Sequence, residues 1–301
     1  MKKVLVTGAS GFIGRHSLEL LSNRGFEVHA ATLGPAQSTR ADVVWHDVNL
    51  LDNYQASTLV SAVKPTHLLH FAWNVAHGKF WASTDNLKWL HASLHLLQEF
   101  IRNGGRRFVT AGTCGEYDWR FGLCDEKYTP MNPSSLYGAT KYALYQLSEK
   151  LCEQAGITLA CGRIFFLYGP GEDSNRFIPS LIHHLSRGEP LPCSHGRQIR
   201  DYLYVADVAS AFVALVESRV RGAVNIASGV PRSLREVAQV VECQVGRSGL
   251  VRFGDLNTDP ALDPAIIIAA VDRLGGEVGW RPSYTFEEGI RETITRFMSQ
   301  V

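Results

Sequence analysis

A tyrosine and a lysine four residues apart, Tyr137 and Lys141, are the side chains with the clearest chemical potential in this sequence of 301 residues. Pro130 and Pro133 precede them and apolar residues at helical spacing follow, so both side chains are expected on one face of a helix. An ammonium group beside a phenol favours the ionised phenol and lowers its pKa from about 10 toward neutral pH. Tyr137 would then be able to exchange a proton with an alcohol oxygen.

Three glycines near the start of the chain, Gly8, Gly11 and Gly14, interrupt an apolar run. The pattern predicts a strand, a glycine turn and a helix. Gly8 would allow the tight turn, Gly11 would let the backbone approach a pyrophosphate, and Gly14 would let the helix pack closely on the strand. Free N–H groups at the helix N-terminus would then face the phosphates. We therefore expect a dinucleotide site, so that proton exchange at Tyr137 would accompany hydride transfer to or from a nicotinamide ring.

Short apolar runs alternate with helical patterns through the first half of the chain. This alternation predicts an α/β fold with a doubly wound parallel sheet of the Rossmann type, in which ligands lie beyond the carboxyl ends of the strands. Thr113 ends the fifth expected strand, so its hydroxyl is expected to hydrogen-bond the same oxygen as Tyr137. The expected strands cover residues 4–6, 27–31, 43–47, 66–72, 107–112 and 159–164, and the main expected helices cover residues 85–102 and 135–154.

The end of the second expected strand bears on which dinucleotide binds. An NAD site usually has an acid there that holds the ribose 2′-hydroxyl, but no acid lies between Glu27 and Asp42, and Thr32 is short and neutral. Arg15 or Arg40 would offer positive charge to a 2′-phosphate, unless both simply lie in solvent. We therefore expect NADP(H), with NAD(H) as the alternative.

Asp47 ends the third expected strand and would either accept a hydrogen bond from the adenine amino group or cap the next turn. Together with the glycine turn and the other strand ends, it belongs to the cofactor contacts that we expect. These contacts are Gly8, Ser10, Gly11, Phe12, Ile13, Gly14, Arg15, Thr32, Asp47, Val48, Phe71, Ala72, Trp73, Tyr137 and Lys141.

The composition excludes several classes of protein. A formal net charge of +1 gives no global attraction to nucleic acid or to an anionic membrane, so any anionic ligand must be held by a few placed arginines. No apolar run approaches the length of a membrane span and no signal peptide is evident, so we expect a cytoplasmic protein. The six cysteines are scattered, which predicts free thiols rather than disulfides or a metal site.

Beyond these residues, the sequence resembles the extended short-chain dehydrogenase/reductase family, also called the nucleotide-sugar epimerase/dehydratase family. The resemblance covers nearly the whole chain. Its motifs are the glycine turn, the triad of Thr113, Tyr137 and Lys141, and the segments 163–171, 200–209, 225–229, 279–282 and 286–290.

The resemblance implies two structural units and a dimer. Residues 1–170 would form a dinucleotide-binding domain, to which part of residues 200–230 returns. Residues 171–301 would mainly form a smaller α/β lobe that closes over a nucleotide sugar. Similar proteins commonly form homodimers through the helices expected at residues 85–102 and 135–154.

The resemblance also assigns residues to the substrate. Lys141 would contact the nicotinamide ribose in addition to its role beside Tyr137. Arg200 would bind the substrate diphosphate, unless it forms an ion pair with Asp201 or Asp207. Arg252 is a second candidate, from its position in the lobe alone.

The residues after Thr113 bear on which reaction is expected. In the family's 4,6-dehydratases, the catalytic hydroxyl residue is followed by Asp and Glu, whereas this chain has Cys114 and Gly115. Glycine cannot move a proton, so 4,6-dehydration is not expected. A 4-ketoreductase needs only NADPH and Tyr137, and a 4-epimerase needs only a retained cofactor. An epimerase acting at carbons 3 and 5 would need its own acid–base pair, for which Cys114 is a candidate unless it is a plain buried thiol.

The loop after the fourth expected strand, residues 73–81, is unusually aromatic. Its tryptophans and His77 would wall the pocket for the nicotinamide and the sugar, with His77 as a candidate substrate contact and proton donor. Alternatively, Trp81 and Trp89 would simply pack at the surfaces of helices and of a dimer.

These observations lead to one expected activity and two alternatives. We expect NADPH-dependent reduction of a nucleotide-linked 4-keto-6-deoxy sugar. The first alternative is a nucleotide-sugar 4-epimerase with tightly bound NAD. The second is a non-catalytic dinucleotide sensor, against which the intact triad of Thr113, Tyr137 and Lys141 argues.

Overall fold

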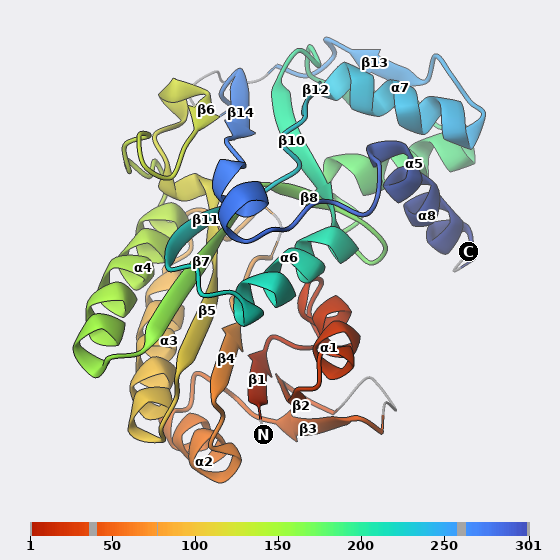
Figure 1. The fold of residues 1–301 in the computed structure, drawn as a ribbon. Coiled ribbons are helices and arrows are strands. Elements are labelled where there is room, and N and C mark those ends of the chain that lie inside the picture. The colour runs from red at the N-terminus through yellow and green to blue at the C-terminus, as the bar shows by residue number, and fades with distance from the viewer. Residues whose placement is uncertain (1, 36–40, 77, 258–262, 300–301) are drawn as a thin grey trace.

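The computed structural model describes residues 2–35, 41–76, 78–257 and 263–299. Its centre is a seven-stranded sheet in the order β11-β7-β5-β4-β1-β2-β3 (Figure 1). Each pair of neighbouring strands runs parallel, which confirms the predicted doubly wound α/β fold. The strands are β1 (Lys3–Thr7), β2 (Glu27–Thr32), β3 (Val43–Asp47), β4 (His67–His70), β5 (Arg107–Thr113), β7 (Thr158–Ile164) and β11 (Gly222–Ile226).

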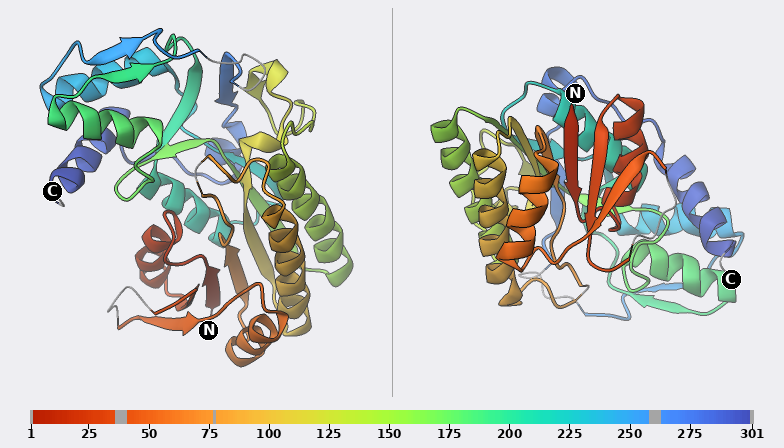
Figure 2. Two further views of the ribbon diagram at one scale, coloured as in Figure 1. Left: turned by 180° about the vertical axis from the view of Figure 1, so that it is seen from behind. Right: turned by 90° about the horizontal axis from the view of Figure 1, so that it is seen from below.

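Helices cover both faces of this sheet, because its strands are apolar on both sides. Along β1, Leu5 packs into the core of one face, whereas Val4 and Val6 pack into the core of the other. One face carries α2 (Asn53–Val63), α3 (Asp85–Arg102) and α4 (Leu136–Ala155), and the opposite face carries α1 (Gly14–Asn23) and α6 (Val205–Glu217) (Figure 1 and Figure 2).

A smaller lobe lies beyond the carboxyl ends of the strands (Figure 1). Its core is one cluster in which Leu181, Val237 and Ile290, each from a different helix, pack together. The helices are α5 (Phe177–Arg187), α7 (Leu234–Val245) and α8 (Phe286–Met298). The strands are β6 (Leu123–Cys124), β8 (Phe166–Tyr168), β9 (Leu191–Cys193), β10 (Ile199–Tyr204), β12 (Pro231–Ser233), β13 (Val251–Phe253) and β14 (Ile266–Ala269).

The seventh strand of the large sheet, β11, comes from far along the chain. It pairs with β7 from Gly222 opposite Ala160 to Ile226 opposite Ile164. The sequence pattern predicts only six strands, because a short apolar run carries no local signal that separates an edge strand of the large sheet from a strand of the lobe. In chain order, α6 and β11 therefore follow the first elements of the lobe, although both pack with the large sheet.

The two longest helices, α3 with 18 residues and α4 with 20 residues, carry charged side chains along their length. Within the described part of the chain, no helix combines the length and the apolar character needed to cross a membrane.

Candidate active site

A cavity of about 560 Å³ lies between the carboxyl ends of the central strands and the smaller lobe. Its wall brings together residues that are far apart in the sequence, including Thr113, Tyr137, Lys141 and Arg200. The large sheet and its connections also supply Gly8, Gly11, Phe12, Ile13, Gly14, Phe71, Ala72, Trp73 and Cys114, all of which were expected to contact cofactor or substrate.

The start of α4 places Tyr137 in this cavity. Ser135 caps the helix, since its hydroxyl accepts a hydrogen bond from the Gly138 N–H at 3.1 Å. A Cβ atom at Gly138 would lie only 2.1 Å from the Gly115 carbonyl oxygen, so only glycine lets α4 pass this close to the turn after β5. That turn is a 3-10 helix, Cys114–Glu116, and Thr113 caps it by accepting a hydrogen bond from the Gly115 N–H at 3.1 Å.

The phenol of Tyr137 is buried, and this burial raises its pKa above the usual value, with Glu116 and Cys114 adding to the effect. A hydrogen-bonding interaction with Thr113 acts in the opposite direction but does not outweigh burial. The expectation that Lys141 lowers this pKa is therefore wrong for this structure. The phenol remains protonated at neutral pH, which suits a proton donor.

Lys141 follows Tyr137 by one turn of α4, and its buried ammonium group binds other partners. Its Nζ donates a hydrogen bond to the Ala111 carbonyl oxygen at 2.9 Å and lies 4.1 Å from the ring centroid of Trp73. Burial lowers the pKa of Lys141 to about 8. These contacts fix the position of the ammonium group at the cavity wall.

A buried ion pair supports the turn after β5. The Glu116 carboxylate accepts hydrogen bonds from the Thr113 N–H and from Arg163 Nε, each at 2.8 Å. Arg163 also donates to the Tyr117 hydroxyl at 3.0 Å, and Tyr117 donates in turn to Asn225 on β11 at 2.8 Å. Glu116 is thus held in a network that positions Thr113, and its carboxylate is not free to act as an acid or base.

Aromatic rings wall the cavity around Tyr137. The rings of Phe80 and Trp81 meet the tyrosine ring edge to face, with centroids at 4.8 and 5.6 Å. Asn86 holds this loop, because it accepts a hydrogen bond from Trp73 Nε1 at 2.8 Å and donates to the Phe80 carbonyl oxygen at 2.7 Å. The loop therefore forms part of the pocket. His77 lies outside the described residues.

At the glycine turn, the start of α1 packs closely against the end of β1, as the sequence predicts. A Cβ atom at Gly14 would lie 2.2 Å from the Gly8 carbonyl oxygen, so a side chain there would push α1 away from β1. The Gly11 N–H donates to the same oxygen at 3.0 Å, which closes the turn.

Five expected cofactor contacts lie near this turn but not in the wall of the cavity. The hydroxyls of Ser10 and Thr32 are 2.6 Å apart, and Asp47 accepts a hydrogen bond from the Gly34 N–H at 2.7 Å. Val48 is buried behind β2, where its N–H donates to the Thr32 carbonyl oxygen at 2.8 Å. Arg15 donates to the Pro170 carbonyl oxygen instead of facing Thr32. Arg40 lies outside the described residues.

Arg200 lines the cavity and is buried, with Asp263 as its ion-pair partner. The partners considered from the sequence, Asp201 and Asp207, are occupied elsewhere. Asp201 accepts hydrogen bonds from Ser228 and Gly229, and Asp207 accepts from two N–H groups of the segment before α8.

The other two substrate candidates have different surroundings. Cys114 lines the cavity, and burial raises the pKa of its thiol well above the usual value. Arg252 is exposed on β13, which pairs with β9 at the outside of the lobe, and it is not part of the cavity wall.

A family model described as the NAD dependent epimerase/dehydratase family matches residues 4–227. The chain belongs to this family. Among curated relatives, CDP-abequose synthase of Salmonella typhimurium is 26% identical, with 97% of this chain and 97% of that protein covered. A dTDP-glucose 4,6-dehydratase of Xanthomonas campestris is 27% identical, with 98% of this chain and 93% of that protein covered.

Solved structures of epimerases have the same fold as this epimerase/dehydratase family member. UDP-glucose 4-epimerase of Thermus thermophilus, solved in complex with NAD, is 27% identical with a TM-score of 0.83, and the match covers 99% of this chain and 100% of that one. UDP-glucose 4-epimerase of Thermotoga maritima, solved with UDP-glucose, is 22% identical with a TM-score of 0.87, and the match covers 99% of each chain.

Sequence reasoning missed several residues of the cavity wall, among them Glu172, Arg176 and Tyr202. Glu172 and Arg176 are four residues apart just after the 163–171 motif of this family, and Tyr202 lies within the 200–209 motif. That spacing of an acid and a base directly after a family motif was the available signal. The spacing could not reveal that the folded lobe buries Glu172 in the cavity wall.

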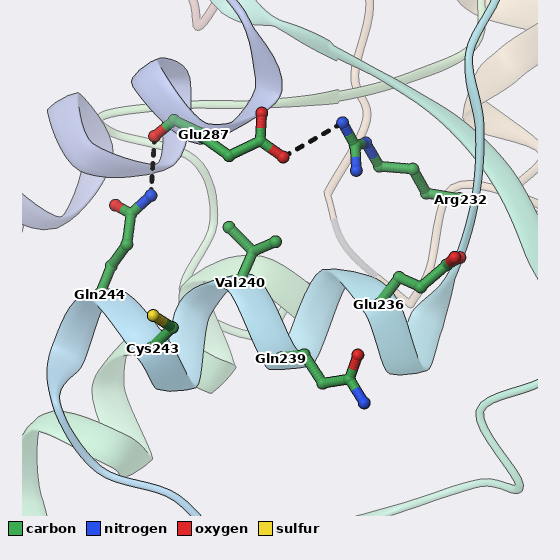
Figure 3. A pocket seen from close by; sticks show the side chains of 7 residues that line it. All are labelled: Arg232, Glu236, Gln239, Val240, Cys243, Gln244 and Glu287. Carbon is green, nitrogen blue, oxygen red and sulfur yellow. Dashed lines mark hydrogen bonds and ion pairs between the residues drawn. The ribbon is translucent and has the colours of Figure 1, made fainter.

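A second hollow, of about 360 Å³, lies along α7 next to the start of α8 (Figure 3). Figure 3 shows Arg232 and Glu287 pointing toward one another, and these two side chains form an ion pair at 3.2 Å. Gln244 donates to the Glu287 carbonyl oxygen at 2.8 Å. None of the residues that line this hollow was expected in the active site. The candidate active site is therefore the larger cavity, which contains Thr113, Tyr137 and Lys141.

Proposed function

We propose that this protein reduces a nucleotide-linked 4-keto-6-deoxy sugar with NADPH, and that Tyr137 donates the proton. The observation that carries the proposal is the position of Thr113, Tyr137 and Lys141 on the wall of one cavity that also contains the glycine turn. A phenol that burial keeps protonated is suited to deliver a proton to a carbonyl oxygen.

The absence of a suitable acid–base pair beside Tyr137 supports reduction over dehydration. Cys114 and Gly115 occupy the positions that are Asp and Glu in the family's 4,6-dehydratases. Burial keeps the thiol of Cys114 protonated, and Glu116 is already bound to Arg163. Among the described residues of the cavity wall, the carboxylates are Glu172, Asp173 and Asp263, all from the lobe side.

The close-packed glycine turn fits a dinucleotide, because a side chain at Gly14 would collide with the Gly8 carbonyl oxygen and push the start of the helix away from the strand. The bound dinucleotide would supply the hydride. Phe71 and Trp73 would flank the nicotinamide end, and Lys141 would contact its ribose. Thr113 and Tyr137 would hold the substrate oxygen, and Arg200 would bind the diphosphate after exchanging its contact with Asp263.

The proposed preference for NADP(H) rests on Thr32, which is neutral and hydrogen-bonded to Ser10 where an NAD site usually has an acid. Arg15 does not contribute to this argument, because its guanidinium group is bound to the Pro170 carbonyl oxygen. Titration of the purified protein with NADPH and with NADH tests the preference. We expect tighter binding of NADPH, and tighter binding of NADH would contradict it.

A nucleotide-sugar 4-epimerase with retained NAD is the second candidate. It is favoured by the likeness to the NAD complex of the Thermus thermophilus 4-epimerase, which holds over 99% of this chain. It needs no acid or base beyond Tyr137, so the cavity wall does not separate the two candidates.

One assay distinguishes the two candidates. Purified protein is incubated with NADPH and a panel of 4-keto-6-deoxy sugars linked to UDP, CDP or dTDP, and with the corresponding hexose conjugates. We expect NADPH to be consumed in proportion to a reduced sugar. Protein that carries stoichiometric NAD and interconverts hexose conjugates without consuming NADPH would overturn the reductase assignment.

A further inference from the structure

The carboxyl group of Glu172 is buried in the wall of the cavity and incompletely hydrogen-bonded. Its side chain is 6% exposed, and its Oε2 atom has no hydrogen-bond partner. The backbone N–H of Glu172 donates to the Gly169 carbonyl oxygen at 3.2 Å, which fixes the start of the segment. A buried polar atom without a partner is costly, so its presence in a cavity wall points to a ligand that supplies the missing partner.

The neighbours of Glu172 do not satisfy it. Arg176 Nε lies 4.0 Å from Oε1, which is beyond hydrogen-bond distance. Arg200 is turned toward Asp263, and Tyr202 lines the cavity alongside these groups. The charge of Arg176 also acts on the phenol of Tyr137, so this part of the wall lies within electrostatic reach of the reacting end.

We propose that Glu172 determines specificity by hydrogen-bonding a ring hydroxyl of the sugar that the cavity holds. This inference rests on the proposed function, because it requires a nucleotide sugar in the cavity. A site built to hydrogen-bond a substrate hydroxyl rejects the analogue that lacks it, since the buried partner is then left unpaired. Glu172 is thus expected to select sugars that keep a hydroxyl facing the lobe.

A sugar hydroxyl matches this carboxyl group better than a phosphate does. Phosphate oxygens carry negative charge, and the cavity wall offers Arg176 and Arg200 for them. Burial, with a smaller contribution from Asp173, raises the pKa of Glu172 to about 8 against the opposing effect of Arg176. A hydroxyl both donates and accepts, so it pairs with the carboxyl group in either protonation state.

The test compares ligands that differ only by the sugar. UDP, CDP and dTDP, and their glucose conjugates, are titrated by calorimetry into the wild-type protein, Glu172→Leu, Glu172→Gln and the matched control Glu189→Gln. Glu189 is an exposed acid on the same lobe. Glu172→Leu removes hydrogen bonding and Glu172→Gln keeps a donor and an acceptor. Glu172→Ala replaces the leucine variant if that variant does not fold.

The quantity compared is the ratio of the affinity for the glucose conjugate to the affinity for the free nucleoside diphosphate. We expect Glu172→Leu to lower this ratio by about tenfold, Glu172→Gln to lower it less, and Glu189→Gln to leave it unchanged. An unchanged ratio in Glu172→Leu, or an equal loss for conjugate and diphosphate, would overturn the inference. A wild-type protein that binds none of the glucose conjugates would also overturn the inference, whereas the proposed function fails only if no NADPH is oxidised with any 4-keto-6-deoxy conjugate.

Discussion

Tyr137 is the residue whose environment most constrains the chemistry. Its burial between Phe80, Trp81 and the turn after β5 (Arg107–Thr113) raises the pKa of the phenol, so the side chain can donate a proton across the neutral range. The same burial lowers the pKa of Lys141 to about 8. Burial is therefore the main cause of both pKa shifts, that of Tyr137 and that of Lys141. The spacing of four residues between them in the sequence does not reveal this burial.

Replacing Tyr137 with Phe removes the hydroxyl and leaves the aromatic packing in place. We expect the turnover number to fall by about a hundredfold or more, because general acid catalysis is lost, whereas NADPH binding changes little. Steady-state kinetics and a cofactor titration measure the two effects. Tyr128→Phe, at a tyrosine that is 82% exposed, is the matched control. Unchanged turnover in Tyr137→Phe would overturn the assigned role.

Glu172 should make the free energy of unfolding depend on pH. Its pKa is raised from 4.5 to about 8 in the folded protein, so the folded state binds more protons than the unfolded state between these values. Stability from this group is therefore present below about pH 4.5 and is lost as the pH rises toward about 8. Glu172→Gln should gain on the order of 4 kcal/mol relative to wild type between about pH 5 and about pH 8.5.

Urea unfolding of both proteins at the two pH values measures this difference. Glu189→Gln, at an exposed acid, should show no such pH-dependent gain. If the difference between Glu172→Gln and wild type stays constant with pH, the carboxyl group of Glu172 does not hold its proton in the folded protein.

At the scale of elements, the contact between the start of α4 (Leu136–Ala155) and the turn after β5 sets the geometry of the triad. Gly138→Ala would place a Cβ atom 2.1 Å from the Gly115 carbonyl oxygen and force the two elements apart. We expect a loss of about 1–3 kcal/mol in unfolding free energy and a lower turnover number. At Gly275, by contrast, a Cβ atom meets nothing within 4 Å, so Gly275→Ala is the control. Full activity and stability of Gly138→Ala would contradict this account.

The elements also show what the sequence could predict and what it could not. The triad residues and the glycine turn were predictable because each depends on neighbours within a few residues. The α3 helix (Asp85–Arg102) has the bounds expected from its apolar spacing. Glu172 was missed because only the folded lobe buries it, and the seventh strand was missed because its pairing joins residues about sixty positions apart, such as Ala160 and Gly222. Long-range packing leaves no trace in local periodicity.

At the scale of the whole molecule, we propose a homodimer through α3 and α4, which pack side by side on one face (Figure 1). Leu87 on α3 is 53% exposed and Leu147 on α4 is 49% exposed, so apolar side chains are available on this face. We expect a dimer by analytical ultracentrifugation and a monomer for Leu147→Glu, because a buried charge without a partner opposes association. Leu123→Glu, at an exposed leucine on β6 (Leu123–Cys124) of the lobe, should remain dimeric. A monomeric wild-type protein would contradict the proposal.

We propose that the cavity of this family member carries out a net reduction at a carbonyl carbon of a nucleotide-linked sugar. To test this reduction, the protein is incubated with a nucleotide-linked 4-keto-6-deoxy sugar and NADPH that carries deuterium at its transferable position, and the product is analysed by NMR. We expect one deuterium at carbon 4 of the product for each NADPH oxidised. A changed sugar without deuterium at that carbon and without NADPH oxidation would contradict it.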